Sequence, residues 1–466
     1  MLKQFSQILN CTEPKLLFGN NGSGIHPLQG LIDYGPFSKS NMLSQFPDSI
    51  RIAAILPAGS YASLSKLVKE LNTTQYPKER KKYLKNFPGF KSLFGVPLEL
   101  NALNGCIELN DNELFEASGN ISHHALADKL GNAVRAMAAR RLEYDVLFIL
   151  LPERWSSGFS CKEENFDLHD FLKAQTATHS IPSQVVRESS ALNYFCRCSV
   201  AWRMSIATYV KAGGIPWKLQ EVNEDTAFIG LSYSVLFNEG TGKYDFITCC
   251  SQVFDADGTG LEFIAYETDE IAHQRGDNPF LSRSEMRKVM ARSISLYQRR
   301  HCGRIPKRVI VHKTTHFTKD EVDGCFDAFH SDTKVDLLQV VQQVDWRGVN
   351  VYSKGNIGGY PVKRGSVVQL DHDQILLWTQ GVVGLNGPFY KEGKGIPEPL
   401  RIVRHAGDGN WLDNAQAILG LTKMDWNHDG LYKRLPITLG YASTLATTIK
   451  RMGSLQNRPY EFRFFM

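Results

Sequence analysis

Short apolar runs alternate with amphipathic stretches through the first half of this 466-residue chain. Residues 52–56 and 145–151 predict buried strands, whereas residues 60–71 and 125–142 have the apolar spacing of helices. Strands that alternate with helices favour parallel sheets with crossover helices, which is a Rossmann-like layout. No G-x-G-x-x-G motif follows these strands, so the residues carry no dinucleotide-binding signature.

A second pattern begins after the segment KAGGIPW at 211–217, because two glycines and a proline end a helix there. Beyond it we predict strands at 226–235, 244–254 and 261–266, with turns at 238–242 and 255–260 between them. A helix with Ser282 and Glu285 at capping-box spacing runs to about residue 301, and a strand follows at 308–312. Three antiparallel strands, a helix and a further strand is the order of an RNase H-like fold.

Together the two patterns predict an α/β protein with two domains. We expect an N-terminal extension or linker at 1–45, a Rossmann-like domain at 46–215 and an RNase H-like domain at 216–466.

The composition is that of an ordinary globular protein, with a net charge of +5 that permits nucleic-acid binding without requiring it. The nine cysteines include no C-x-x-C pair, so we expect reduced, mostly buried thiols rather than disulfides or a zinc site. Neither a signal peptide nor an apolar run long enough to span a bilayer is evident. We therefore expect a cytoplasmic protein with no membrane partner.

Four polar residues are candidates for binding a phosphate. His169 and Lys173 are four apart on one face of a helix that Asn165 or Asp167 would cap, with Phe166 just before the cap at Asp167. Gln184 follows in a strand-like run, and Lys211 ends the last long helix of the first domain. Charge-assisted donors of this kind could surround a terminal phosphate. Taken singly, each is an ordinary surface residue, and a lysine at a helix C-terminus is expected from the helix dipole alone.

The order H-x-x-x-K, then Q, then K-x-G-G resembles the MID domain of Argonaute proteins, and GGIPW at 213–217 is similar to the MID-to-PIWI junction of prokaryotic members. Further stretches resemble PIWI domains, namely FIGLSYS (228–234), VIVHK (309–313), PVKRG (361–365), LWTQG (377–381), LTKMDWN (421–427) and LPIT (435–438). The resemblance runs from about residue 25 to the end. It implies a Rossmann-like MID domain followed by an RNase H-like PIWI domain, without the N and PAZ domains of longer members. This is the pattern of short prokaryotic Argonautes, which pair with a separate APAZ-containing effector protein.

The same resemblance places the metal-ligand positions of active PIWI domains at Ser232, Thr314 and Ser443. Neutral hydroxyls cannot replace three anionic ligands around two divalent cations, so we expect no cleavage by this chain. We expect the nearby carboxylates to be structural, in turns or at a helix start; these are Asp255, Asp257, Asp320, Glu321, Asp371 and Asp373.

The resemblance also implies ligands and partners. His169, Lys173, Gln184 and Lys211 would hold the 5′ phosphate of a guide RNA, and the terminal carboxylate of Met466 would hold a Mg²⁺ ion there, unless this apolar end is buried for packing alone. Contacts to the guide or target backbone would come from Lys313, Lys363 and Arg364, which could equally be ordinary surface charges. The target would be single-stranded DNA. The effector partner would carry a TIR or sirtuin-like NAD-consuming domain, or less often a nuclease, and activation could involve a higher oligomer.

Two other functions fit the residues. One is an active guided endonuclease, and the other is an enzyme acting on a small-molecule phosphate or nucleotide through the Rossmann-like half.

Overall fold

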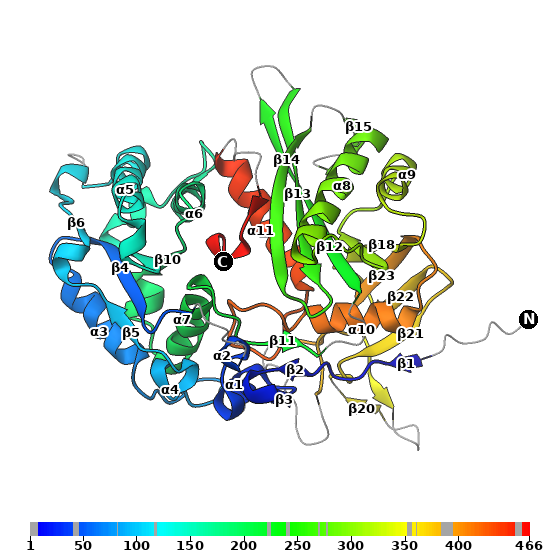
Figure 1. Ribbon diagram of the computed structural model, residues 1–466, viewed down its shortest axis with the longest axis horizontal. Coiled ribbons are helices and arrows are strands. Elements are labelled where there is room, and N and C mark those ends of the chain that lie inside the picture. The colour runs from blue at the N-terminus through cyan, green and yellow to red at the C-terminus, as the bar shows by residue number, and fades with distance from the viewer. Residues whose placement is uncertain are drawn as a thin grey trace, which may run out of the picture.

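The structure is a computed structural model that describes residues 8–40, 46–81, 83–115, 119–220, 225–238, 243–268, 271–275, 278–351, 357–359, 361–383, 395–452 and 459–466. Most of the turn predicted at 238–242 therefore lies outside the described residues. Figure 1 shows two halves, each built on its own sheet, with the C-terminus between them. Among the described helices, none combines the length and apolar character that crossing a membrane requires.

The first half is a parallel sheet flanked by helices. Its strands, in spatial order, are β10 (Ser183–Arg187), β7 (Val146–Leu151), β4 (Ile50–Pro57) and β5 (Leu98–Leu100), with β6 (Ile107–Leu109) also paired to β4. The main helices are α3 (Tyr61–Leu71), α5 (His123–Ala138), α6 (Leu168–Thr178) and α7 (Arg197–Lys211). Every residue of β7 is buried, as expected for a strand covered on both faces. The Rossmann-like prediction is confirmed.

The second half is a ten-stranded mixed sheet. Its centre is made of β12 (Thr226–Asn238), β13 (Lys243–Asp255), β14 (Gly260–Thr268), β17 (Arg308–Lys313) and β18 (Lys334–Val341). β12, β13 and β14 are antiparallel neighbours, whereas β12, β17 and β18 are parallel. α8 (Arg283–Arg300) connects these two groups and begins where Ser282 Oγ accepts a hydrogen bond from the Glu285 amide. This is the predicted RNase H-like order.

The remaining strands extend the sheet at both edges. They are β23 (Leu400–Ala406), β22 (Gln374–Leu377), β21 (Ser366–Gln369) and β1 (Ile8–Asn10) on one side, and β24 (Pro459–Tyr460) on the other.

The first described residues, 8–14, pack against the second half. β1 pairs with β21, with Ile8 opposite Val368. The Glu13 carboxylate lies 3.1 Å from the Arg364 guanidinium and 2.6 Å from the Lys423 ammonium. Much of the segment predicted as an extension or linker is therefore part of a folded domain. β1 is too short to show a hydrophobic period, and its partner lies about 360 residues away, so local sequence patterns do not reveal it.

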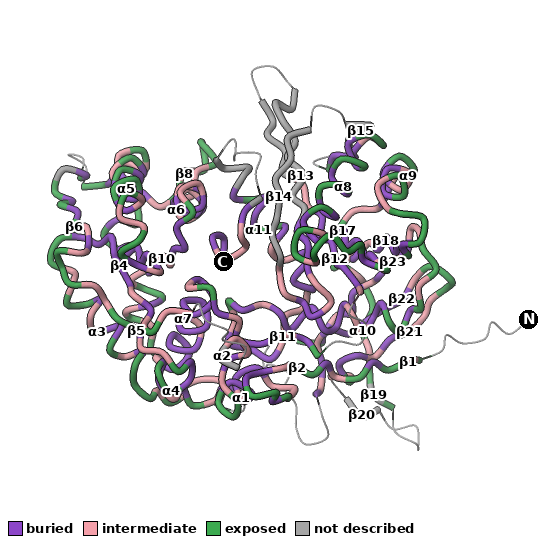
Figure 2. Tube along the Cα trace, in the orientation of Figure 1, coloured by how far each residue is buried: buried purple, intermediate pink, exposed green. Residues whose placement is uncertain are grey.

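The two halves meet around α11 (Ile437–Met452) and the C-terminal residues. α6 contributes two alanines to a buried cluster there, whose members are Ala174, Ala177, Leu445, Ala446, Tyr460, Phe464 and Phe465. Figure 2 shows that the chain end lies among buried segments. A second contact is the ion pair between Arg80 and Asp429, at 2.7 Å.

α11 approaches β12 so closely that only glycine fits at the crossing. A Cβ atom added at Gly230 would lie 1.9 Å from the Thr438 carbonyl oxygen. The Thr438 hydroxyl, in the same turn of α11, lies 2.9 Å from Nδ1 of the buried His312.

We predict that Gly230→Ala lowers the free energy of unfolding by about 1–3 kcal/mol, because α11 must move away from the sheet. Gly440→Ala is the matched control, since a Cβ there would meet nothing within 4 Å. Alanine within a helix is favoured over glycine, so this control should be neutral or stabilising by up to about 1 kcal/mol. Urea unfolding measures both, and equal effects of the two variants would contradict the packing argument.

Candidate functional site

The start of α6 positions the phosphate candidates on that helix. The Asp167 carboxylate caps the helix by accepting a hydrogen bond from the Asp170 amide at 3.1 Å. Phe166, just before the cap, has its ring 6.0 Å from that of Phe171, which is the arrangement of a hydrophobic staple. Both features agree with the sequence prediction. They fix the direction in which α6 enters, so that Lys173 points into the protein, where its side chain is buried.

The structure brings three of the four predicted phosphate ligands together with the chain end. Lys173 Nζ donates hydrogen bonds to the Ser183 carbonyl at 2.8 Å and to a Met466 main-chain oxygen at 2.6 Å. Lys211 Nζ donates to Gln184 Oε1. Lys173 and Lys211 are only 3% and 1% exposed. The site therefore joins α6, the start of β10, the end of α7 and the last residue of the sequence.

His169, the fourth candidate, lies in the first turn of α6 at the border between interior and surface. Its side chain is 41% exposed, and Nδ1 lies 3.4 Å from a carboxylate oxygen of Asp170. Donor atoms of Asp167, His169 and Asp170 lie within 4.8 Å of one another. His169 is thus placed one helical turn from Lys173, with its side chain partly exposed.

The two lysines are electrostatically unusual. Burial lowers the pKa of Lys173 to about 7. Burial, together with the neighbouring charge of Lys173, holds the pKa of Lys211 well below its ordinary value. Among the residues that the structure describes, neither ammonium forms an ion pair with an Asp or Glu side chain. Apart from the Met466 main-chain oxygen beside Lys173, the described residues supply no counter-charge. Burying positive charge in this way is costly, so an anion would be favoured in this pocket.

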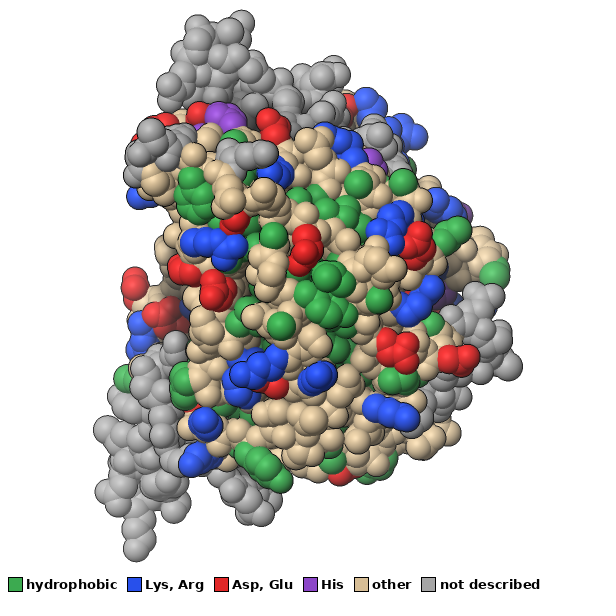
Figure 3. Space-filling model, turned by 90° about the vertical axis from the view of Figure 1, so that its left-hand side faces the viewer, with side chains coloured by type: hydrophobic (Ala, Val, Ile, Leu, Met, Phe, Trp, Pro, Cys, Tyr) green, Lys and Arg blue, Asp and Glu red, His purple; other side chains and the backbone are tan. Residues whose placement is uncertain are grey.

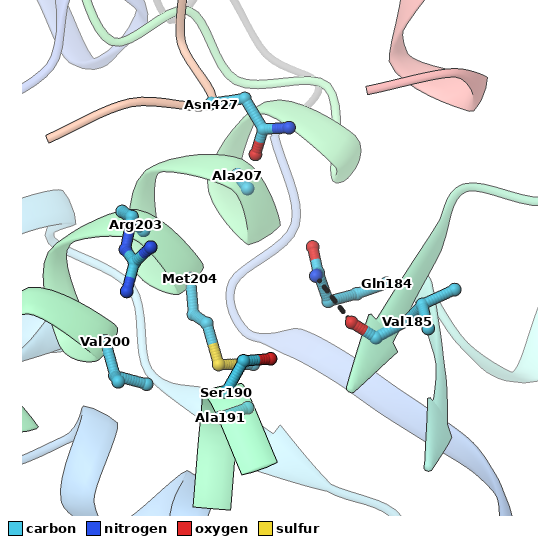
Figure 4. Close-up of a pocket in the computed structure, with 9 residues that line it drawn as sticks. All are labelled: Gln184, Val185, Ser190, Ala191, Val200, Arg203, Met204, Ala207 and Asn427. Carbon is cyan, nitrogen blue, oxygen red and sulfur yellow. Dashed lines mark hydrogen bonds between the residues drawn. The ribbon is translucent and has the colours of Figure 1, made fainter. Parts of the chain in front are cut away.

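A cavity of about 200 Å³ adjoins Gln184. Figure 4 shows the residues around it, which come from β10, the turn after β10, α7 and a loop of the second half: Gln184, Val185, Ser190, Ala191, Val200, Arg203, Met204, Ala207 and Asn427. The Gln184 amide donates to the Val185 carbonyl at 3.0 Å, which orients its oxygen toward Lys211. The site thus has open space beside its polar groups.

The surface around this half carries mixed charge. Figure 3 shows Lys and Arg side chains interspersed with Asp and Glu over the face of the first half. Opposite charges that alternate over a surface largely cancel beyond the Debye length of about 8 Å at physiological salt. A preference of this half for phosphate must therefore come from local groups such as Lys173 and Lys211.

Ser232, Thr314 and Ser443 lie on adjoining elements of the second half. In the parallel register of β12 and β17, Leu231 pairs with Lys313. Ser232 is the next residue on β12, and Thr314 is the first residue beyond the end of β17. Ser443 is on α11, which packs along β12. The groups of metal-ligating side chains found among the described residues lie in the first half, away from these three.

The structure places Lys313 and Arg364 in the interior, where neither can contact a nucleic-acid backbone. Lys313 is 1% exposed and lies 2.6 Å from the Glu321 carboxylate, among the rings of Tyr233, Phe280 and Phe317. Arg364 is 2% exposed, pairs with Glu13 and donates to main-chain carbonyls and to the Thr422 hydroxyl. Both are structural ion pairs. Of the three predicted backbone contacts, only Lys363 is exposed.

The carboxylates expected to be structural have local or ion-pair partners. Glu321 completes a capping box with Thr318 at the start of α9 (Lys319–Ala328) and also accepts from Tyr233 and the Leu281 amide. Asp257 accepts from the Thr259 amide within its turn. The other partners are His301 for Asp255 and the Asp373 amide for Asp371. Asp320 lies in the first turn of α9, as predicted.

Neither a protein-family model nor a curated protein matches this sequence. Solved structures match over nearly the whole chain. Argonaute of Clostridium butyricum, bound to a guide DNA and a 19-mer target DNA, superimposes with a TM-score of 0.64 and 19% identity over 97% of this chain and 54% of its own. The fold is Argonaute-like. Argonaute of Aquifex aeolicus gives a TM-score of 0.63 and 17% identity over 100% of this chain and 56% of its own, both on its own and with externally bound siRNA. The chain thus spans a little over half the length of these proteins, with the fold of their MID and PIWI domains.

We predict that the substitution Lys173→Met stabilises the ligand-free protein, and that this gain over wild type is larger at pH 7 than at pH 9. In the unfolded chain Lys173 keeps its proton to about pH 10.5, whereas in the folded protein it loses the proton above about pH 7. The unfolded state therefore binds more protons between these values, and the stability of the wild type rises with pH by at most ~1.4 kcal/mol per unit. Urea unfolding at both pH values tests this. If the stability difference between variant and wild type does not change with pH, the prediction of a buried ammonium at Lys173 is wrong. Lys363 is exposed, so Lys363→Met is the control, and its stability difference from wild type should not change with pH.

Proposed function

We propose that this protein binds the 5′-phosphorylated end of a guide strand and uses that strand to recognise a nucleic-acid target. The observation that supports this most directly is the buried pair Lys173 and Lys211, which lies beside Gln184. Among the described side chains, no carboxylate is a partner of either lysine. A phosphate dianion would supply the missing negative charge. Its oxygens would accept hydrogen bonds from both ammonium groups, while His169 could stack on the first base.

The last residue, Met466, could add oxygen ligands for a metal ion. Mg²⁺ prefers hard oxygen ligands and typically combines one or two carboxylates with substrate phosphates and waters. The Met466 terminus lies in the pocket and would supply such a carboxylate, so the residues fit a Mg²⁺ ion placed between it and the guide phosphate. When bound, the ion would neutralise the charge between the two anions. Lys173 would still orient the terminus through its hydrogen bond.

We further propose that the protein does not cut its target. Positions 232, 314 and 443 carry hydroxyls where two-metal cleavage needs carboxylates. The nearby Glu321 is already engaged by Lys313, Tyr233 and two main-chain amides.

A protein that binds a target without cutting it must pass the signal on. We propose, by analogy with short Argonautes, a guide RNA, a single-stranded DNA target and an APAZ-containing effector partner of TIR or sirtuin-like type, whose activity would be switched on by target pairing. Sequence would be read by base pairing, while the protein positions the backbone.

We predict that Lys173→Met with Lys211→Met removes the preference for a 5′-phosphorylated guide. Each charge-assisted hydrogen bond contributes about 1.5–3 kcal/mol, so the affinity of the double variant for the 5′-phosphorylated guide should fall by at least about 10- to 100-fold. Affinity for the same oligonucleotide with a 5′ hydroxyl should change little. Fluorescence anisotropy with both guides measures this, and Lys363→Met is the matched control. An unchanged preference for the phosphate in the double variant would overturn the assignment.

We also predict no target cleavage by the guide-loaded protein in Mg²⁺ or Mn²⁺. A labelled target, complementary to the guide, should remain intact on a denaturing gel while a mobility shift shows that it is bound. Products cut opposite the middle of the guide would show instead that the protein is an active guided nuclease.

A further inference from the structure

Four metal-ligating side chains converge on the surface of the first half, away from the buried lysines. His123 and His124 are the first two residues of α5. Cys161 is in the two-residue strand β8 (Ser160–Cys161), and Glu164 follows in the turn that leads to β9 (Phe166–Asp167). Two segments separated by about 40 residues thus present two imidazoles, a thiol and a carboxylate to one place.

The distances are close to those of a metal centre. His123 Nε2 lies 3.1 Å from a Glu164 carboxylate oxygen, and His124 Nε2 lies 3.0 Å from the same group. The Cys161 sulfur, one His123 nitrogen and one Glu164 oxygen all lie within 4.8 Å of one another. Around a tetrahedral Zn²⁺, with bonds of about 2.0–2.3 Å, ligand atoms are separated by roughly 3.3–3.8 Å. Small side-chain rotations would therefore bring His123, Cys161 and Glu164 to these separations. His124 contacts Glu164 but is not part of that close group, so it would complete the set by a larger rotation of its exposed side chain.

The backbone holds these groups in place. β8 pairs with β9, with Cys161 opposite Phe166, so the turn between them is short. Asn165 adopts φ +51°, a left-handed conformation that asparagine tolerates, and its amide donates to the Lys162 carbonyl at 3.2 Å. The Phe166 ring packs 5.1 Å from the His123 ring and ties the turn to α5.

The Cys161 thiol distinguishes this cluster from an ordinary surface ion pair. An exposed His–Glu pair contributes little to stability, and it needs no cysteine. Imidazole nitrogen, thiolate sulfur and carboxylate oxygen are the three ligand types that zinc takes from proteins. His123 and Cys161 are partly buried, with the His123 side chain 16% exposed, which leaves them shielded but reachable by an ion.

We propose that His123, His124, Cys161 and Glu164 form a Zn²⁺ site that fastens the β8–β9 turn to the start of α5. Binding forms bonds from zinc to the two imidazole nitrogens, the carboxylate and the Cys161 sulfur, and the thiol proton is released to solvent. This site does not depend on the proposed guide binding. Because β9 runs directly into α6, zinc would also stiffen the segment that carries His169.

The test uses the full chain, reduced and stripped of metal with a chelator. Co²⁺ serves as the optical probe, because tetrahedral coordination gives visible absorption bands and a thiolate ligand adds a charge-transfer band in the near ultraviolet. We expect one equivalent of Co²⁺ to produce both signals and one equivalent of Zn²⁺ to abolish them. Zn²⁺ should also raise the melting temperature of the wild type.

Cys161→Ser should lose the charge-transfer band, and His123→Asn should weaken Zn²⁺ binding at least about tenfold. Cys302→Ser is the matched control, since Cys302 is an exposed free cysteine in the other half. Circular dichroism without metal verifies that each variant folds. The proposal is overturned if the wild type shows no thiolate band, if the band survives in Cys161→Ser, or if it is lost in Cys302→Ser instead.

Discussion

Two ammonium groups enclosed at the junction of the halves determine how this molecule is built. Lys173 and Lys211 arrive from different helices, and the chain end closes over them. Neither lysine has an Asp or Glu partner among the described side chains, and burial disfavours the charged form of each. This electrostatic cost falls at the contact between the two halves, where α6 packs against α11.

Charge is treated differently in the second half. Lys313 is enclosed with Glu321, and Arg364 and Lys423 with Glu13, so each buried cation there has a carboxylate at hand. Such pairs are costly to break, because removal of one partner leaves a buried charge. The two halves thus differ, since no Asp or Glu side chain is described as a partner of Lys173 or Lys211.

Much of the fold was predictable, because long apolar runs such as β7 and the helical spacing of α6 are local patterns. Helical spacing placed Lys173 and His169 one turn apart on α6, as the structure has them, and the structure brings Gln184 and Lys211 close to Lys173; their role in phosphate binding stays a prediction. The burial of Lys313 and Arg364 was not predictable, because a short motif does not show whether its lysine or arginine faces solvent or a buried carboxylate. The partner of Arg364, for example, is Glu13, about 350 residues away in the sequence. The cluster around Cys161 was missed for a related reason. Its ligands do not follow C-x-x-C spacing, and only the β8–β9 turn brings Glu164 to His123.

The pairing of β1 with β21 has a consequence for biosynthesis. Ile8 finds its neighbour Val368 only after about 360 further residues have been made. At translation rates of about 5–20 residues per second, the first strand waits roughly 20–70 seconds for its partner. The parallel sheet between residues 50 and 187 is complete long before then and can fold on the ribosome. The N-terminal strand must remain without this partner meanwhile.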